Sequence, residues 1–215
     1  MSDSMSDAPL PGDQAQDEVI RALLPNVAFD GWTSRALRSA MISLGRPPED
    51  AVLLFPGGAA EMIEAYFRWA DEDMASAARE ADLAAFRLPA RVRAIVALRF
   101  ERNRENKEAI RRALAILALP QNAVLAARIT ARTVDAIWHA AGDRSADFAW
   151  YTKRAILAAA YGAAVLYWLT DDGLDDSATM EFFDRRLAGI ARFGKIRRGI
   201  ESRLPFRRRD PLPSA

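Results

Sequence analysis

The chain has 215 residues, 51% of them hydrophobic, so it is long enough to bury one substantial core. It contains no cysteine and a single histidine, His139, which excludes disulfides, thiolate chemistry and a histidine-rich metal site. No histidine lies three residues after a glutamate, so the Glu-x-x-His ligand pairs of di-iron bundles are missing. The formal net charge is only +1, which for the chain as a whole favours neither nucleic acid nor membrane.

The N-terminal residues 1–16 contain Asp, Ser, Pro and Gly, and they lack the basic start and apolar core of a secretory signal. We predict that they are disordered and that the protein is cytoplasmic. The longest nearly uninterrupted apolar run covers residues 155–169, which is shorter than the ~20 residues that a membrane-spanning helix needs. We therefore expect attachment to a membrane surface at most.

The first predicted helices are short. Apolar residues at helical spacing predict one helix over residues 17–28 and another after Thr33, whose side chain is suited to cap it. A third short segment follows Pro47 and Pro48. Three short helices at this spacing predict a helix-turn-helix-like subdomain over residues 17–58.

Residues 48–54 would read DNA in such a subdomain. They offer Glu49 and Asp50 but no Lys, Arg, Asn or Gln. Contacts with phosphate need cations, and base edges are usually read by those missing side chains. We therefore predict no binding of nucleic acid, and a ligand-responsive transcriptional regulator remains the alternative.

Longer helices are predicted in residues 59–176. Helical spacing indicates a helix over residues 59–80, a second that begins near Pro89, and a third that ends before Pro120. The first arm of a helical hairpin then covers residues 122–141. We predict that this region is a helical bundle. The chain offers no convergent acid, base, metal or nucleophile set, so we expect that it is not an enzyme.

The turn of the hairpin follows Gly142, which is suited to end a helix in a left-handed conformation. Asp143 or Ser145 is suited to cap the next helix. Trp150 and Tyr151 are about 100° apart on that helix, so they cannot both point in the same direction. At least one is expected at the surface, and the pattern alone leaves core anchors and an aromatic docking patch equally open.

The string from Trp138 to Arg154 reads Trp-His-x-x-Gly-Asp-x-Ser-x-Asp-Phe-x-Trp-Tyr-Thr-x-Arg. It resembles the signature of the lipid-binding accessory proteins of coenzyme Q (ubiquinone) biosynthesis, the ninth coenzyme-Q protein family, and the similarity covers about residues 18–187. The resemblance implies an all-α fold like that of the TetR regulators, with a degenerate helix-turn-helix before a larger ligand-binding bundle. It also implies a non-enzymatic protein that binds isoprenoid quinone precursors, contacts the membrane and helps the di-iron demethoxyubiquinone hydroxylase.

Small residues on neighbouring turns after residue 154 favour close helix packing when taken alone, whereas an isoprenoid ligand needs a long apolar cavity. Under the resemblance, the expected ligand is an isoprenoid quinone or a phospholipid, with no further cofactor and no metal. The candidate cavity walls are Leu117, Val124, Leu125, Ile129, Val134, Ile156, Ala159, Tyr161, Ala163, Val165 and Leu166. The candidate surface for the hydroxylase comprises Asp135, Ile137, Asp147, Trp150, Tyr151 and Arg154. A homodimer is expected by analogy with TetR-like proteins.

The C-terminal part concentrates positive charge. Residues 185–209 contain ten basic residues and one acid, Glu201, so they carry +9 while the rest of the chain carries −8. We predict an amphipathic basic helix over residues 177–206 that binds anionic lipid at the inner membrane, followed by a disordered tail over residues 207–215. A nucleic-acid-binding tail is the competing interpretation. The candidate membrane contacts are Leu187, Ile190, Phe193, Lys195, Ile196, Arg198, Ile200 and Leu204.

Overall fold

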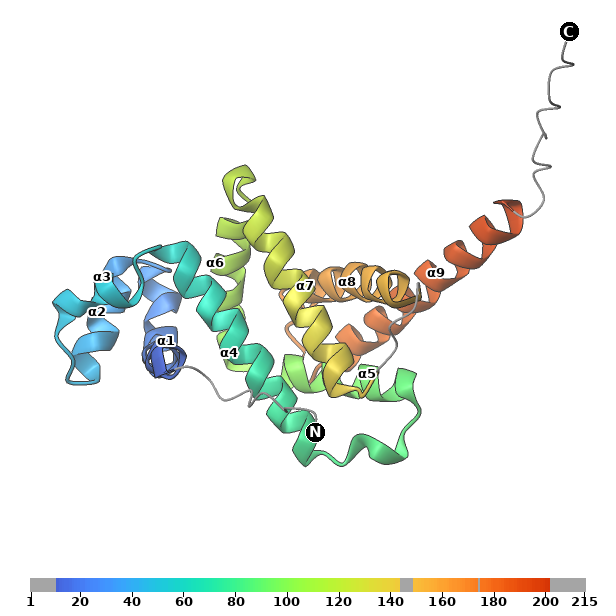
Figure 1. Cartoon of the computed structure of the whole chain (residues 1–215), viewed down its shortest axis with the longest axis horizontal. Coiled ribbons are helices and arrows are strands. Elements are labelled where there is room, and N and C mark those ends of the chain that lie inside the picture. The colour runs from blue at the N-terminus through green and yellow to red at the C-terminus, as the bar shows by residue number, and fades with distance from the viewer. Residues whose placement is uncertain (1–10, 144–148, 174, 202–215) are drawn as a thin grey trace, which may run out of the picture.

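The computed structural model describes residues 11–143, 149–173 and 175–201, with side chains placed as far as residue 189. All secondary structure in these residues is helical (Figure 1), which confirms the predicted fold class. The helices are α1 Pro11–Asp30, α2 Ser34–Ser43, α3 Ala51–Leu54, α4 Ala59–Glu80, α5 Leu88–Arg102, α6 Lys107–Leu117, α7 Ala123–Ala140, α8 Ala149–Trp168 and α9 Ser177–Glu201. Single 3-10 turns lie at Pro48–Asp50, Leu83–Ala85, Arg104–Asn106 and Pro120–Asn122.

Helix α1 begins earlier than the sequence indicates. Residues 11–16, which we placed in a disordered lead, are helical. Proline is favoured in the first turn of a helix, and an acidic residue such as Asp13 interacts favourably with the helix dipole there. Arg68 of α4 pairs with both Asp13 and Asp17, so contacts with the bundle extend the helix.

The helix-turn-helix-like subdomain is closed by local signals. Gly31 has φ 69°, which ends α1 in the left-handed region, and the Thr33 hydroxyl accepts a hydrogen bond from the Ala36 backbone N–H at 3.2 Å. The third helix, α3, has only four residues. Val52 and Leu53 on it are 67% and 80% exposed, so the position of a DNA-reading helix presents two apolar side chains beside an acidic turn.

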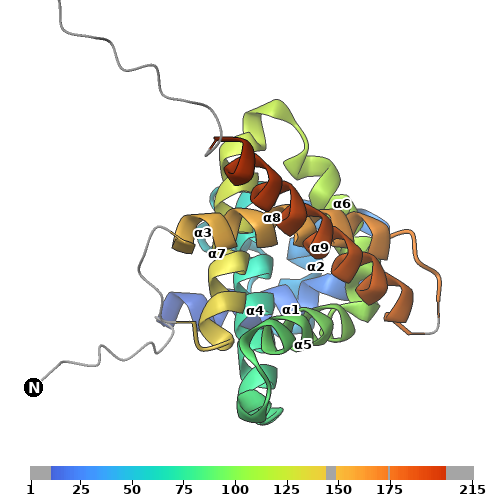
Figure 2. The same ribbon diagram turned by 90° about the vertical axis from the view of Figure 1, so that its right-hand side faces the viewer.

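Helix α4 runs through the middle of the molecule and has the bounds predicted for it (Figures 1 and 2). It packs against α1 on one side and against α5 and α7 on the other. Its buried residues recur at helical spacing, as expected for an amphipathic helix. This one helix therefore packs against both the small subdomain and the bundle.

In the hairpin of α7 and α8, the first helix, α7, ends where predicted. Gly142 has φ 76°, and the Asp143 backbone N–H donates to the Trp138 carbonyl at 3.1 Å, as in a Schellman-type helix end. Helix α8 is apolar on nearly all sides, and it packs against both α7 and α9. Figure 2 shows α8 and α9 side by side.

Helix α9 belongs to the bundle only in its first half. Phe183 is fully buried, and Asp184 accepts a hydrogen bond from Arg93 of α5 at 2.9 Å. The later turns extend past the other helices (Figure 1). Within the described residues no single helix is long and apolar enough to cross a bilayer. One pair of consecutive segments, Arg104–Leu117 and Pro120–Ala140, is long and apolar enough when taken together, but it is bent by 99°.

Candidate functional site

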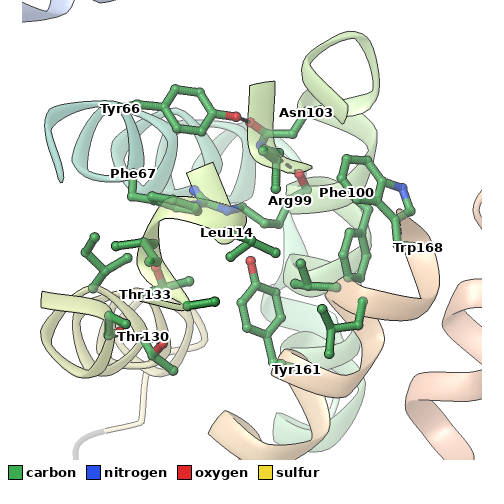
Figure 3. A pocket seen from close by; sticks show the side chains of 18 residues that line it. Tyr66, Phe67, Arg99, Phe100, Asn103, Leu114, Thr130, Thr133, Tyr161 and Trp168 are labelled. Atoms are coloured by element: carbon green, nitrogen blue, oxygen red, sulfur yellow. Dashed lines mark hydrogen bonds between the residues drawn. The ribbon is translucent and has the colours of Figure 1, made fainter. Parts of the chain in front are cut away.

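A cavity of about 370 Å³ lies between α4, α5, α6, α7 and α8 (Figure 3). Aliphatic and aromatic side chains form most of its wall, and polar groups gather at the end formed by α4 and α5. Leu166 and Ala118 line the cavity and are also exposed, Leu166 by 63%, so the cavity reaches the surface at these residues.

Five of the predicted wall residues line this cavity, and binding of a lipid to them remains a prediction. The five are Leu117, Ile129, Tyr161, Val165 and Leu166. Among the others, Val124 and Ala159 are exposed, Leu125, Ile156 and Ala163 are half-buried elsewhere, and Val134 is buried beside a different groove. Ala159 and Ala163 are each two residues from Tyr161, so on α8 they point about 200° away from the buried Tyr161 side chain.

The sequence analysis missed the side of the cavity that α4 and α5 contribute. Tyr66 and Phe67 come from α4, and Arg99, Phe100 and Asn103 come from α5 or its end. The sequence could have indicated Arg99, because this arginine falls at a core position on the apolar face of α5. A charged residue at such a position is rarely fully buried unless it is paired.

The partner of Arg99 is Asp71 of α4, which is also buried. The Arg99 Nη2 lies 2.9 Å from an Asp71 oxygen, and the Thr133 hydroxyl of α7 donates to the same carboxylate at 2.9 Å. Arg132 Nε approaches it at 3.5 Å. Burial, the largest effect, raises the pKa of Asp71, and Arg99, Thr133 and Arg132 act in the opposite direction without cancelling it. Burial by itself lowers the pKa of Arg99, but Asp71, Tyr161 and Tyr66 together outweigh it, so the pKa is raised.

A second set of hydrogen bonds holds the polar end of the cavity. The Tyr66 hydroxyl donates to Asn103 Oδ1 at 2.6 Å, and Asn103 Nδ2 donates to the Arg99 carbonyl at 2.8 Å. Burial raises the pKa of Tyr66, so its hydroxyl remains a donor. Tyr161 stacks on Phe100, and its hydroxyl points toward Arg99 (Figure 3).

An aromatic cluster lies outside the cavity on the hairpin, formed by Asp135, Trp150, Tyr151 and Arg154. The ring of Tyr151 meets that of Trp150 edge to face at 4.6 Å, and Tyr151 is 70% exposed. The Arg154 guanidinium lies 3.8 Å from the centre of the Trp150 ring and pairs with Asp135. Four of the six residues predicted for the partner surface therefore lie together, and their binding of a partner is still a prediction.

The other two residues predicted for the partner surface are Ile137 and Asp147. Ile137 is fully buried, so its placement on the surface is wrong. It is two residues from Asp135 on α7, so it points to the opposite side of the helix. Asp147 lies outside the described residues.

The predicted membrane contacts are only partly described. Leu187 is half-buried and packs against the core, so it is a bundle residue rather than a free apolar contact. The residues Ile190, Phe193, Lys195, Ile196, Arg198 and Ile200 belong to α9, but their side chains lie outside the described part, as does Leu204 altogether. Among the described residues, no group of three or more His, Asp or Glu side chains is placed to hold a metal ion.

Comparison with known proteins agrees with the resemblance seen at the hairpin. Residues 123–194 match the model of the COQ9 family. The chain is 30% identical over 190 residues to the probable ubiquinone biosynthesis protein coq9, mitochondrial, of Dictyostelium discoideum, which covers 86% of this chain and 62% of that protein. It is 29% identical over 208 residues to the human ubiquinone biosynthesis protein COQ9, mitochondrial, and the match covers 88% of this chain and 62% of the human protein. The chain thus spans about three fifths of the length of these relatives.

Among solved structures, the chain is similar to a TetR transcriptional regulator from Nitrosomonas europaea. The TM-score is 0.66 at 19% sequence identity, and the similarity covers 83% of this chain and 98% of the regulator. At this identity the likeness shows the fold, and the predicted TetR-like fold is confirmed. Residues 123–194 match the COQ9 family model, and over most of its length the chain is similar to COQ9 proteins of ubiquinone biosynthesis.

Proposed function

We propose that this chain is a non-enzymatic lipid-binding protein of ubiquinone biosynthesis. It binds isoprenoid quinone intermediates at the membrane and presents them to the di-iron demethoxyubiquinone hydroxylase. A role in ubiquinone biosynthesis is supported by the similarity to proteins that carry this name. The observation that carries the ligand-binding part is the apolar cavity between α4 and α8.

The cavity suits an apolar ligand by size and by lining. Its volume of about 370 Å³ lies within the range of about 300–1,000 Å³ that is usual for small-molecule sites. Protein interiors are otherwise closely packed with few voids larger than a water molecule, so a space of this size supports a ligand site. The openings at Leu166 and Ala118 give an apolar chain a way in.

The aromatic cluster supports the docking part of the proposal. Tryptophan, tyrosine and arginine are the residues that most often dominate the energy of a protein interface. Here the Trp150 ring contacts both Tyr151 and Arg154, beside an open groove that is lined by alanines of α7 and α8. A rigid aromatic projection beside a groove with small side chains fits a helix of the hydroxylase.

The charge of the C-terminal segment supports attachment to the membrane. Helix α9 leaves the bundle, and the chain from residue 185 to residue 209 carries +9. Near an anionic bilayer each basic residue contributes about 1 kcal/mol of attraction. The relatives are named as mitochondrial proteins, and for this chain we propose peripheral attachment to an inner membrane and a homodimer of the TetR-like kind.

The test is extraction of the natively purified protein followed by mass spectrometry of its lipids. Gly162 lines the cavity, and a Cβ added there meets no atom within 4 Å, so Gly162→Phe fills cavity space without a clash at the backbone. We expect polyprenyl quinones or phospholipids in the wild type and in Trp150→Ala, and their loss in Gly162→Phe. A protein that is empty in all three forms and shifts a promoter fragment would favour the transcriptional regulator instead.

A further inference from the structure

The polar end of the cavity contains a buried donor without a well-formed hydrogen bond. Arg99 is 3% exposed, and its Nη1 makes no hydrogen bond of good geometry in the part of the chain that the structure describes, although the Tyr161 hydroxyl lies near enough to interact with the guanidinium. The other terminal nitrogen, Nη2, is held by Asp71 at 2.9 Å. A buried charged donor is rarely left without an acceptor, so this nitrogen points to a ligand group at the cavity wall.

The other polar groups of the wall are already engaged. The hydroxyl of Thr133 donates to Asp71, that of Thr130 donates to the Ala126 carbonyl at 2.9 Å, and that of Tyr66 donates to Asn103. Arg99 Nη1 is thus the cationic donor left for a ligand, with the Tyr161 hydroxyl directed at the same place (Figure 3). Arg99 Nη1 can only donate, and the Tyr161 hydroxyl can donate as well as accept, so an acceptor oxygen on the ligand could take a hydrogen bond from either group.

The surrounding charges decide what kind of acceptor fits. The fully buried pair of Arg99 and Asp71 is neutral by itself, and Arg132 and Glu64 beside it are partly exposed. A further pair of Glu64 with Arg128 lies at the surface, where solvent screens it. A ligand anion would therefore lose its hydration without gaining a net positive charge, whereas a neutral oxygen would lose much less.

We propose that the ligand binds with its head group inward. A neutral acceptor, a ring carbonyl or ether oxygen, takes a hydrogen bond from Arg99 Nη1 beside the Tyr161 hydroxyl, and the apolar tail leads toward Leu166 and Ala118. This inference rests on the proposed function, because it assumes that the cavity binds a lipid. It adds that the ring is shielded while it is held and must leave the polar end before it is presented to an enzyme.

The test compares two probes of similar shape by isothermal titration calorimetry on the full chain. Decylubiquinone carries carbonyl and methoxy oxygens, and decylbenzene carries none. Because hydrogen bonds to charged groups are stronger than hydrogen bonds between neutral groups, we expect the wild type to bind decylubiquinone about tenfold more tightly than decylbenzene. Dodecanoate, an anion, is expected to bind more weakly than decylubiquinone, and tighter binding of dodecanoate would overturn the neutral head group.

Two variants probe the head group. Arg99→Lys keeps a cation for Asp71 but removes the second terminal nitrogen, and Tyr161→Phe removes only the hydroxyl. We expect Arg99→Lys to abolish the preference for decylubiquinone and Tyr161→Phe to reduce it severalfold, with decylbenzene unaffected by either. If Arg99→Lys does not fold, Tyr161→Phe decides, and an unchanged preference there contradicts the proposal.

The cavity-filling variant separates this inference from the proposed function. Gly162→Phe should weaken both probes, because it removes the space that their tails occupy. If the wild type binds neither probe, the proposed function itself fails. If it binds both equally and the head-group variants change nothing, lipid binding stands and the inward orientation of the head group is wrong.

Discussion

The two halves of the molecule use their interiors differently. In the helix-turn-helix-like subdomain, Ile20, Leu23 and Trp32 are buried in apolar packing, and the Trp32 indole donates to the Ala109 carbonyl of α6 at 3.0 Å. In the bundle, the interior holds a cavity and a buried ion pair, Asp71 with Arg99. The fold is shared with a transcriptional regulator, and of these two regions it is the bundle that has a cavity beside a buried ion pair.

The largest expected effect comes from breaking the ion pair of the bundle. Asp71→Ala leaves the Arg99 charge buried without a carboxylate, which should lower the free energy of unfolding by about 3–5 kcal/mol. Asp73→Ala on the same helix is the control, because Asp73 faces the more exposed Arg102 at 3.9 Å and should cost about 0–1 kcal/mol. Urea unfolding measures both, and equal losses would contradict a special role for the buried pair.

A smaller effect is expected where the two halves meet. Trp32→Phe keeps a ring in the core but removes the donor to the buried Ala109 carbonyl, so the free energy of unfolding should fall by about 1–3 kcal/mol. Phe29→Ala is the matched change at an exposed aromatic residue and should stay within about 0.5 kcal/mol. A loss in Phe29→Ala as large as that in Trp32→Phe would mean that this junction is not the source of the effect.

Two glycines, Gly162 in the cavity wall and Gly142 at the end of α7, are expected to respond to alanine in opposite ways. Gly162→Ala should stabilise the protein by about 0.5–1 kcal/mol, because the new Cβ meets open space and alanine is the better helix former. Gly142→Ala should destabilise it by about 1–2 kcal/mol, because φ is 76° there and the Cβ would lie 3.2 Å from Arg91 Nη1. Thermal unfolding followed by circular dichroism gives both signs, and the same sign for both would count against the described conformations.

The smallest effect on stability is expected at the aromatic cluster. Tyr151→Ala removes a side chain that is 70% exposed, so unfolding should change by about 0.5 kcal/mol or less. The affinity of the Tyr151→Ala protein for the hydroxylase, measured by calorimetry, should nevertheless fall at least about fivefold, since truncating an interface tyrosine often costs more than 1 kcal/mol. Unchanged affinity would remove the cluster from the docking surface.

Local signals predicted the fold well, and they failed where packing decides. Thr33 and Gly142 act within a few residues of themselves, so their cap and stop could be read directly from the sequence. The rotation of a helix about its axis depends on its neighbours, which is why Ala159 faces solvent and Ile137 faces the core.

The polar end of the cavity was beyond sequence reasoning for a related reason. Asp71, Arg99 and Thr133 come from three helices and are separated by about 30 residues each, so no short pattern links them. Only an arginine at a core position of α5 hinted at the pair, and that signal names neither its partner nor the cavity beside it.

The most direct test of the central claim is transfer of quinone out of a membrane. Vesicles that contain ubiquinone and an anionic phospholipid are incubated with the full chain and removed by centrifugation, and quinone bound to protein in the supernatant is quantified by mass spectrometry. We predict quinone with the wild type and with Gly162→Ala, and little with Gly162→Phe, whose side chain fills the cavity. Equal amounts with Gly162→Phe, or none with the wild type, would contradict the claim that this cavity takes up the lipid.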